Sequence, residues 1–191
     1  MVDELPIGKS RRFLGNANSV LNGFVGGWRL STILLVQTGP YDTPFIFFDS
    51  SGMGNFNRPD VIGNPNLSHP TPDHWWDASA FACPGQTAFT GTGNQLDCSN
   101  APMVGRFGFS HVGTLIGPKT FNLSLGLAKN FKLTKRFNLR FESSFTNVPN
   151  HVNWDDPANS VTDNNFGQSA FARTGDAGGN RVGQFALRLE F

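Results

Sequence analysis

The last eight residues of the chain constrain its fold most, because they alternate without interruption between polar and apolar side chains. They read Gln184-Phe185-Ala186-Leu187-Arg188-Leu189-Glu190-Phe191. Successive side chains of a β-strand point to opposite faces, so Phe185, Leu187, Leu189 and Phe191 share one apolar face. Two folds use such a strand: a soluble β-sandwich that buries the apolar face, and a transmembrane β-barrel that turns it toward lipid.

Three earlier stretches, near 28–38, 119–131 and 136–146, show the same alternation, and the first of them is the least regular. With the terminal stretch, near 181–191, they make four candidate strands. An Arg or Lys side chain that faces lipid at the middle of a bilayer costs about 2–4 kcal/mol. In the third and fourth strands, the charged residues Arg140, Glu142, Arg188 and Glu190 fall on the face opposite the large apolar side chains. The pattern therefore predicts that five residues face the lumen of the barrel. There they are solvated or mutually paired residues of the wall, or they contact a plug or substrate. These residues are Arg29, Arg140, Glu142, Arg188 and Glu190.

The connections between these strands differ greatly in length. The stretches 49–117 and 147–180 are long and rich in Gly, Asn and Pro, whereas only a short basic turn separates the second and third strands. Outer-membrane barrels have long extracellular loops and short periplasmic turns. We therefore expect an all-β fold, with about four or five antiparallel strands of a transmembrane β-barrel. Residues 1–191 are expected to form a single partial domain.

Composition excludes several classes of function. The net charge is +1, which gives no electrostatic basis for binding nucleic acid, and no apolar run is long enough for a transmembrane helix. No GxSxG, HExxH or P-loop pattern is present, so we expect neither an enzyme nor a bound cofactor. Asp155, Asp156 and Asp163 offer oxygen atoms to calcium, but their spacing matches no known calcium loop.

Cysteine and tryptophan give the remaining candidate sites. Cys83 and Cys98 are the only cysteines, and either a disulfide or two unpaired loop thiols fits their spacing of 15 residues. Trp75, Trp76 and Phe81 are candidates for stacking on a flat ligand such as a sugar, or for anchoring the long loop by packing. The alternative to a membrane barrel is a soluble or secreted β-sandwich that binds carbohydrate through these aromatic loops.

An ordered set of short motifs resembles the last part of Oar-like TonB-dependent receptors, which contain a carboxypeptidase-regulatory-like domain. Each motif alone is weakly specific, but together they cover nearly the whole chain in the order of that family. The motifs are Gly27-Trp28-Arg29-Leu30-Ser31, Gln37-Thr38-Gly39, Arg58-Pro59-Asp60, Gly63-Asn64-Pro65, Trp76 with Ala80-Phe81, Asn122-Leu123-Ser124-Leu125, Lys129-Asn130-Phe131, Phe141-Glu142, Phe145-Thr146-Asn147, Asn150-His151, Phe166-Gly167-Gln168 and Arg181 with residues 184–191.

The resemblance implies a protein of the Gram-negative outer membrane whose barrel has about 22 strands. Four or five strands cannot close a barrel, so the chain is expected to be a C-terminal fragment or a truncated gene product. The implied partners are outer-membrane lipid, the barrel-assembly machinery, TonB and an unknown ligand. A terminal strand that closes on an aromatic residue resembles the assembly signal of such barrels, here Phe185, Leu187, Leu189 and Phe191.

Overall fold

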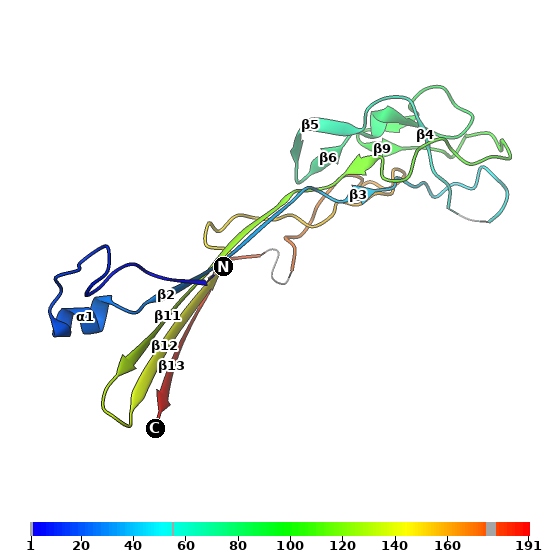
Figure 1. The fold of residues 1–191 in the computed structure, drawn as a ribbon. Coiled ribbons are helices and arrows are strands. Elements are labelled where there is room, and N and C mark those ends of the chain that lie inside the picture. Colours follow the sequence, from blue (N-terminus) through cyan, green and yellow to red (C-terminus); the bar gives the residue numbers. More distant parts are fainter. Residues whose placement is uncertain (1, 55, 175–178) are drawn as a thin grey trace. The chain divides into compact units, whose positions relative to one another are not determined.

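The computed structural model describes residues 2–54, 56–174 and 179–191, which form a nearly all-β protein (Figure 1). The chain divides into two compact units: unit 1 holds residues 1–36, 121–152 and 174–191, and unit 2 holds residues 37–120 and 153–173. The elements are β1 (Val2–Glu4), α1 (Ser19–Val25), β2 (Arg29–Gln37), β3 (Tyr41–Asp42), β4 (Asp60–Val61), β5 (Asn66–Thr71), β6 (His74–Trp76), the 3-10 helix η1 (Ala78–Ala80), β7 (Phe81–Ala82), β8 (Gly91–Thr92), β9 (Gln95–Leu96), β10 (Leu115–Ile116), β11 (Thr120–Lys132), β12 (Asn138–Thr146) and β13 (Val182–Glu190). Among the described residues, no helix is both long and apolar enough to span a bilayer.

Unit 1 is built on one five-stranded sheet in the order β1-β2-β11-β12-β13, which leaves β1 and β13 at its edges (Figure 1). The strands β11, β12 and β13 form an antiparallel meander. Its register sets Phe131 opposite Leu139, which in turn lies opposite Leu189. Because unit 1 contains a single sheet among its described residues, it is not the two-sheet sandwich of the alternative interpretation.

One face of this sheet is covered by large apolar side chains. Phe141 lies opposite Leu187, and the ring of Phe185 packs at 6.4 Å from that of Phe141 and 5.5 Å from that of Phe145. Gly183 lies opposite Phe145, where a Cβ atom would come within 2.6 Å of the phenyl ring. The glycine therefore makes room for an aromatic side chain on this face.

The two ends of the sheet differ in the length of the connections between strands: long connections leave from one end, and, with one exception, a short turn is found at the other. The connections from β2 to β11 and from β12 to β13 leave from the same end of the sheet, and they supply the residues of unit 2. At the other end, residues 133–137 form a tight turn in which Leu133 N–H donates to the carbonyl of Phe137. The exception is the connection from β1 to β2, which joins the strands at the end of the tight turn yet spans residues 5–28 and contains α1.

Unit 2 is more ordered than the sequence suggests for loop residues. Its described residues form four two-stranded sheets: β3 with β10, β4 with β7, β5 with β6, and β8 with β9. Its core joins residues from distant parts of the chain: Ile46, Trp76, Ala78, Phe81, Cys83, Leu96, Cys98, Leu115, Val161 and Phe166. The stretches 49–117 and 147–180 lack strand periodicity because their strands are short, but they carry enough apolar residues for a separate core.

Two glycines allow the backbone of unit 2 to close beside β3. A Cβ atom at Gly39 would lie 1.8 Å from the carbonyl oxygen of Gly117. The N–H of Gly117 donates to the carbonyl of Pro40 at 2.8 Å. Any side chain at residue 39 would collide with the facing backbone, so this hydrogen bond depends on glycine.

Candidate functional site

Four charged residues of β12 and β13 lie together on the polar face of the sheet, opposite the apolar one. Arg140 lies opposite Arg188 across β12 and β13, and each arginine is near a glutamate of its own strand. Arg140 Nε donates to Glu142 at 2.8 Å, and Arg188 Nε lies 3.9 Å from Glu190. These exposed pairs neutralise the polar face locally, and each contributes little to stability.

Arg29 is at the start of β2, where it lies opposite Glu4 of β1. Ser31, two residues further along β2, lies on the polar face, because a Cβ atom added to Gly126 on that face would collide with Ser31 Oγ. Arg29 and Ser31 are two residues apart on one strand and thus share a face. All five predicted lumen-facing residues therefore lie on the polar side of the sheet.

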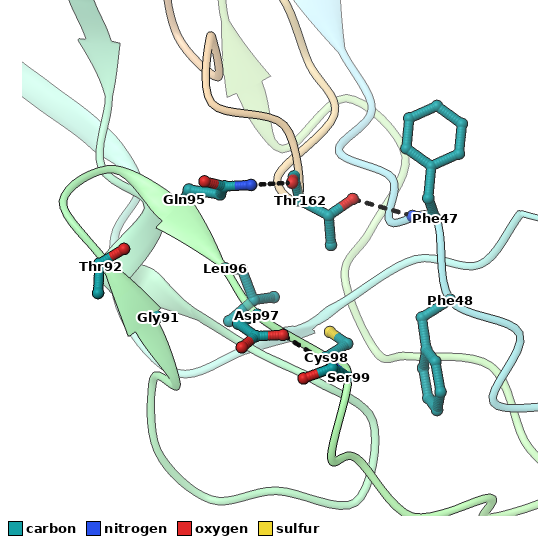
Figure 2. A pocket seen from close by; sticks show the side chains of 10 residues that line it. All are labelled: Phe47, Phe48, Gly91, Thr92, Gln95, Leu96, Asp97, Cys98, Ser99 and Thr162. Atoms are coloured by element: carbon teal, nitrogen blue, oxygen red, sulfur yellow. Dashed lines mark hydrogen bonds between the residues drawn. The ribbon is translucent and has the colours of Figure 1, made fainter.

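Unit 2 contains a pocket of about 410 Å³, lined by residues from three separate segments (Figure 2). Phe47 and Phe48 come from the segment after β3, Thr162 comes from the segment between β12 and β13, and the remaining lining residues surround the β8–β9 hairpin. The lining residues are Phe47, Phe48, Gly91, Thr92, Gln95, Leu96, Asp97, Cys98, Ser99 and Thr162. The pocket thus combines aromatic rings with a carboxylate, an amide and hydroxyl groups, as small-molecule sites do.

Hydrogen bonds fix the polar side chains of this pocket. Gln95 Nε2 donates to the carbonyl of Thr162 at 2.8 Å, and the Phe47 N–H donates to Thr162 Oγ1 at 3.0 Å (Figure 2). One carboxylate oxygen of Asp97 accepts from the Ser99 N–H at 2.8 Å. Hydrogen bonds from Ser99 lower the pKa of Asp97, so this pocket carries a negative charge at neutral pH.

A disulfide between Cys83 and Cys98 ties one wall of the pocket to the core, with Cα atoms 5.6 Å apart. Both cysteines are buried, and Cys98 is also a lining residue. The cross-link closes a ring of 15 residues that contains the β8–β9 hairpin. The structure thereby selects the paired alternative, and it gives the pairing a role in holding the pocket.

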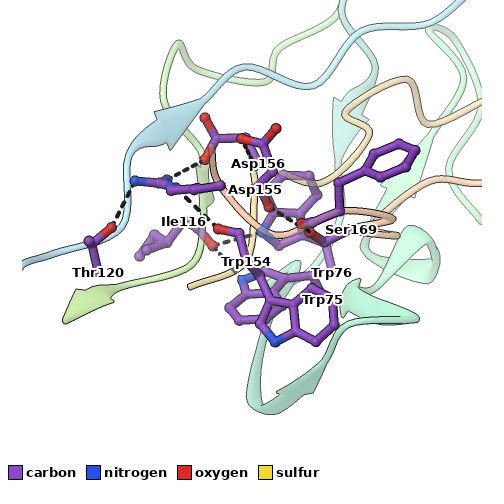
Figure 3. Close-up of polar contacts among 10 residues, drawn as sticks. Trp75, Trp76, Ile116, Thr120, Trp154, Asp155, Asp156 and Ser169 are labelled. Atoms are coloured by element: carbon purple, nitrogen blue, oxygen red, sulfur yellow. Dashed lines mark hydrogen bonds and ion pairs between the residues drawn. The ribbon is translucent and has the colours of Figure 1, made fainter. Parts of the chain in front are cut away.

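The three aromatic residues considered for stacking on a ligand or for anchoring the long loop have different surroundings. Trp76 and Phe81 are fully buried in the core of unit 2, so their rings are not available to a ligand, and their observed role is packing. Trp75 is half-buried. The indole N–H groups of Trp75 and Trp76 both donate to the carbonyl of Ile116, at 3.1 and 2.9 Å (Figure 3). This shared acceptor orients the Trp pair against β10.

Two of the three aspartates considered for calcium, Asp155 and Asp156, accept hydrogen bonds from other residues of unit 2. Arg173 donates to Asp156 at 2.7 Å, to Thr120 Oγ1 at 2.8 Å and to the carbonyl of Trp154 at 3.1 Å. The carbonyl of Asp155 accepts from Ser169 Oγ (Figure 3). In the part of the chain that the structure describes, no three His, Cys, Asp or Glu residues lie together as a metal-binding group.

A mostly buried ion pair stabilises the part of unit 2 around β4. Both terminal nitrogens of Arg106 donate to the Asp60 carboxylate, at 2.9 and 2.7 Å. The N–H groups of Phe109 and Gly85 donate to the same carboxylate. Burial raises the pKa of Asp60, but these four donors outweigh it and lower that pKa below its ordinary value.

We expect Asp60→Asn to lower the free energy of unfolding of unit 2 by about 2–3 kcal/mol at pH 7, because Arg106 loses its partner. A lowered pKa in the folded state means that the contribution is full above the ordinary pKa of Asp and is lost as pH falls through the lowered value. Pulse proteolysis in urea, with thermolysin at pH 7 and with pepsin at pH 3, measures both effects. The exposed Asp73→Asn serves as the control, and equal pH dependence of wild type and Asp60→Asn contradicts the assignment.

The pocket could not be found from the sequence, because its lining comes from segments that only the folded core brings together. Phe47, Thr92 and Thr162 belong to no recognisable motif. The one local signal was the cysteine pair, whose ring encloses the hairpin that forms one wall. Strand periodicity carries no information about such a site, since it reports only which face of a sheet is apolar.

Comparison with known proteins agrees with the geometry of the sheet. The family model of the outer membrane beta barrel domain matches residues 1–184. No curated protein and no solved structure matches the chain. A sheet with one apolar and one charged face, together with a match over nearly the whole chain, places the protein in the outer membrane. The chain belongs to the outer membrane beta barrel domain family.

Proposed function

We propose that the chain is the C-terminal part of an Oar-like TonB-dependent receptor, in which it contributes to ligand binding and uptake across the outer membrane. The observation that carries this proposal is the placement of the pocket. Its lining residues belong to the two long connections that leave the sheet at one end, opposite the tight turn. Long connections at one end of an outer-membrane barrel are extracellular, where a receptor meets its ligand.

The edges of the sheet support a larger barrel. The described strands form an open sheet that ends at β1 and β13. An unpaired strand edge in lipid leaves backbone N–H and C=O groups without partners, which the hydrocarbon core does not tolerate. We infer that further strands of the same receptor pair with these edges, that TonB supplies energy for uptake, and that the protein binds and transports without catalysing a reaction.

Growth on single nutrients tests the uptake. A strain that lacks the gene is grown on a panel of sole carbon, iron and cobalamin sources, beside a strain that lacks TonB and a strain that lacks both. We expect one source on which all three strains grow equally poorly, because a transporter without its energy source is inactive. Normal growth of the gene deletion on every source, or a defect that adds to the loss of TonB, argues against the proposal.

A substitution in the pocket of unit 2 tests whether the growth defect depends on ligand binding there. Asp97→Asn removes the charge of the pocket but keeps the oxygen that accepts from Ser99. We expect cells that carry it to grow at least about tenfold more slowly at limiting nutrient, since a lost charged hydrogen bond weakens binding by about that factor. Asp73→Asn makes the same chemical change at an exposed position that does not line the pocket. An equal effect of both substitutions removes the pocket from the proposal.

The terminal strand is proposed to be read by the barrel-assembly machinery. Phe191 is almost fully exposed, and its ring lies 6.5 Å from that of Phe137 at the tight-turn end. We expect Phe191→Ala to slow insertion into the outer membrane several-fold while leaving the strand pairing of Glu190 with Asn138 intact. Pulse-chase labelling with detection of the heat-modifiable form on gels measures insertion. Wild-type kinetics for Phe191→Ala, with the exposed Phe171→Ala of unit 2 as control, would falsify this role.

A further inference from the structure

One lysine breaks the separation of charged and apolar residues in the sheet. Lys129 of β11 lies opposite Phe141 and therefore belongs to the apolar face, between Leu127 and Phe131. Its side chain is nevertheless buried, with the whole residue only 4% exposed. A buried cation on a lipid-facing surface requires a compensating negative charge or dipole.

The protein supplies only partial compensation for this charge. Lys129 Nζ donates to the carbonyl of Phe24 at 2.7 Å, and it lies 4.8 Å from the ring centroid of Phe131 and 5.3 Å from that of Trp28. Carbonyl and ring contacts are favourable, but neither carries a full negative charge. Among the described residues no carboxylate forms an ion pair with Lys129, and a lysine ammonium has two further donors.

Lys129 lines a pocket of about 790 Å³ between the β1–β2 connection and the sheet, entirely within unit 1. The pocket has a basic part and an apolar part. Lys9, Arg11 and Lys132 join Lys129 among the cations, and Glu4, the only carboxylate among the described lining residues, pairs with Arg11 at 2.9 Å. The apolar part is formed by Ile7, Phe24, Phe131, Leu133 and Leu139.

The β1–β2 connection has the composition of a segment at a membrane surface. It exposes Phe13, Val20 and Phe24 beside its basic residues. Apolar side chains enter the acyl region while Lys and Arg remain at the level of anionic headgroups. The connection joins its strands at the same end of the sheet as the tight turn. In an outer-membrane barrel the short turns lie where the strands leave the membrane.

We propose that this pocket binds an anionic phospholipid, with the phosphate held by Lys129 and Lys9 and the acyl chains along Phe131 and Leu139. The phosphate completes the charge balance of Lys129, and the apolar residues continue into the lipid-facing side of the sheet. The basic part of the pocket lies beside its apolar part, as the phosphate and the acyl chains of a phospholipid require. A soluble anion would need only the basic part.

Native mass spectrometry of the full-length protein, purified from outer membranes in detergent, tests the proposal with phosphatidylglycerol as the probe. We expect wild type to retain phosphatidylglycerol about tenfold better than phosphatidylcholine, because the pocket is lined by Lys9, Lys129 and Lys132, none of which has a carboxylate partner among the described residues. Lys129→Met should lose this preference. Lys135→Met, an exposed change in the tight turn outside the pocket, should keep it.

Two further measurements keep the test decisive. Displacement of phosphatidylglycerol by millimolar inorganic phosphate would show a free-anion site and overturn the lipid assignment. If Lys129→Met does not produce the folded, heat-modifiable form, the double variant Lys9→Gln with Arg11→Gln replaces it, since both residues are exposed. The double variant should lower the lipid preference about threefold or more. Unchanged retention in either folded variant overturns the proposal.

Discussion

Leu187→Arg is expected to prevent most of the protein from assembling in the outer membrane. Leu187 lies near the middle of β13, on the apolar face opposite Phe141, and its side chain is largely exposed to the surroundings. An arginine that faces lipid near the middle of a bilayer costs about 2–4 kcal/mol. A shift of this size changes the ratio of folded to unfolded protein by about 30- to 1,000-fold.

The neighbouring residue provides a matched control. Ala186→Arg introduces the same side chain one residue earlier, on the polar face, where it lies opposite Glu142. We expect Ala186→Arg to assemble as wild type does, because the charge points away from lipid and toward a carboxylate. Outer-membrane fractionation and gel detection of the heat-modifiable form measure assembly. Equal assembly of the two variants would show that the two faces of the sheet are assigned wrongly.

Reduction of the Cys83–Cys98 disulfide is expected to give the largest loss of stability in unit 2. A cross-link that closes a ring of 15 residues contributes about 3 kcal/mol by limiting the unfolded chain. Because Cys98 lines the pocket and Cys83 lies in the core, opening the ring should release the β8–β9 hairpin first. The urea midpoint for thermolysin resistance of unit 2, with and without reductant, measures the loss.

Comparison of the reduced protein with a double variant separates the cross-link from packing. The reduced wild type keeps both sulfur atoms in the core, whereas Cys83→Ala with Cys98→Ala removes them as well. We expect the double variant to be less stable than the reduced protein by about a further 1 kcal/mol, because it loses buried atoms. The heat-modifiable behaviour of unit 1 should not change in either case. Unaltered protease resistance on reduction would contradict the proposed role of the disulfide.

Four of the five described strands of the sheet were predictable because alternation is a local property of the chain, whereas β1, only three residues long, was not predicted. The structure has β2, β11, β12 and β13 at residues 29–37, 120–132, 138–146 and 182–190, close to the stretches whose periodicity indicates strands. The apolar and polar faces follow from the same alternation. The exception is Lys129, whose position on the apolar face is readable from the sequence but whose burial depends on the β1–β2 connection.

The structure of unit 2 could not be predicted from local sequence patterns. Its strands are only two to six residues long, which is too short for periodicity to be distinguished from chance. The sequence left two alternatives for Cys83 and Cys98, paired or free, and two for Trp76 and Phe81, ligand stacking or packing. The fold pairs the cysteines and buries both rings. Burial depends on which distant segments pack together, and no single stretch contains that information.

The sequence by itself determined the all-β class, the two faces of the sheet and the end from which the long connections leave. These follow from hydrophobic alternation and loop length, which act over a few residues. Only the tertiary structure decided the core of unit 2, the pocket behind the disulfide and the basic pocket around Lys129. Each of these sites joins residues that are tens of positions apart, so packing and the satisfaction of buried polar groups place them.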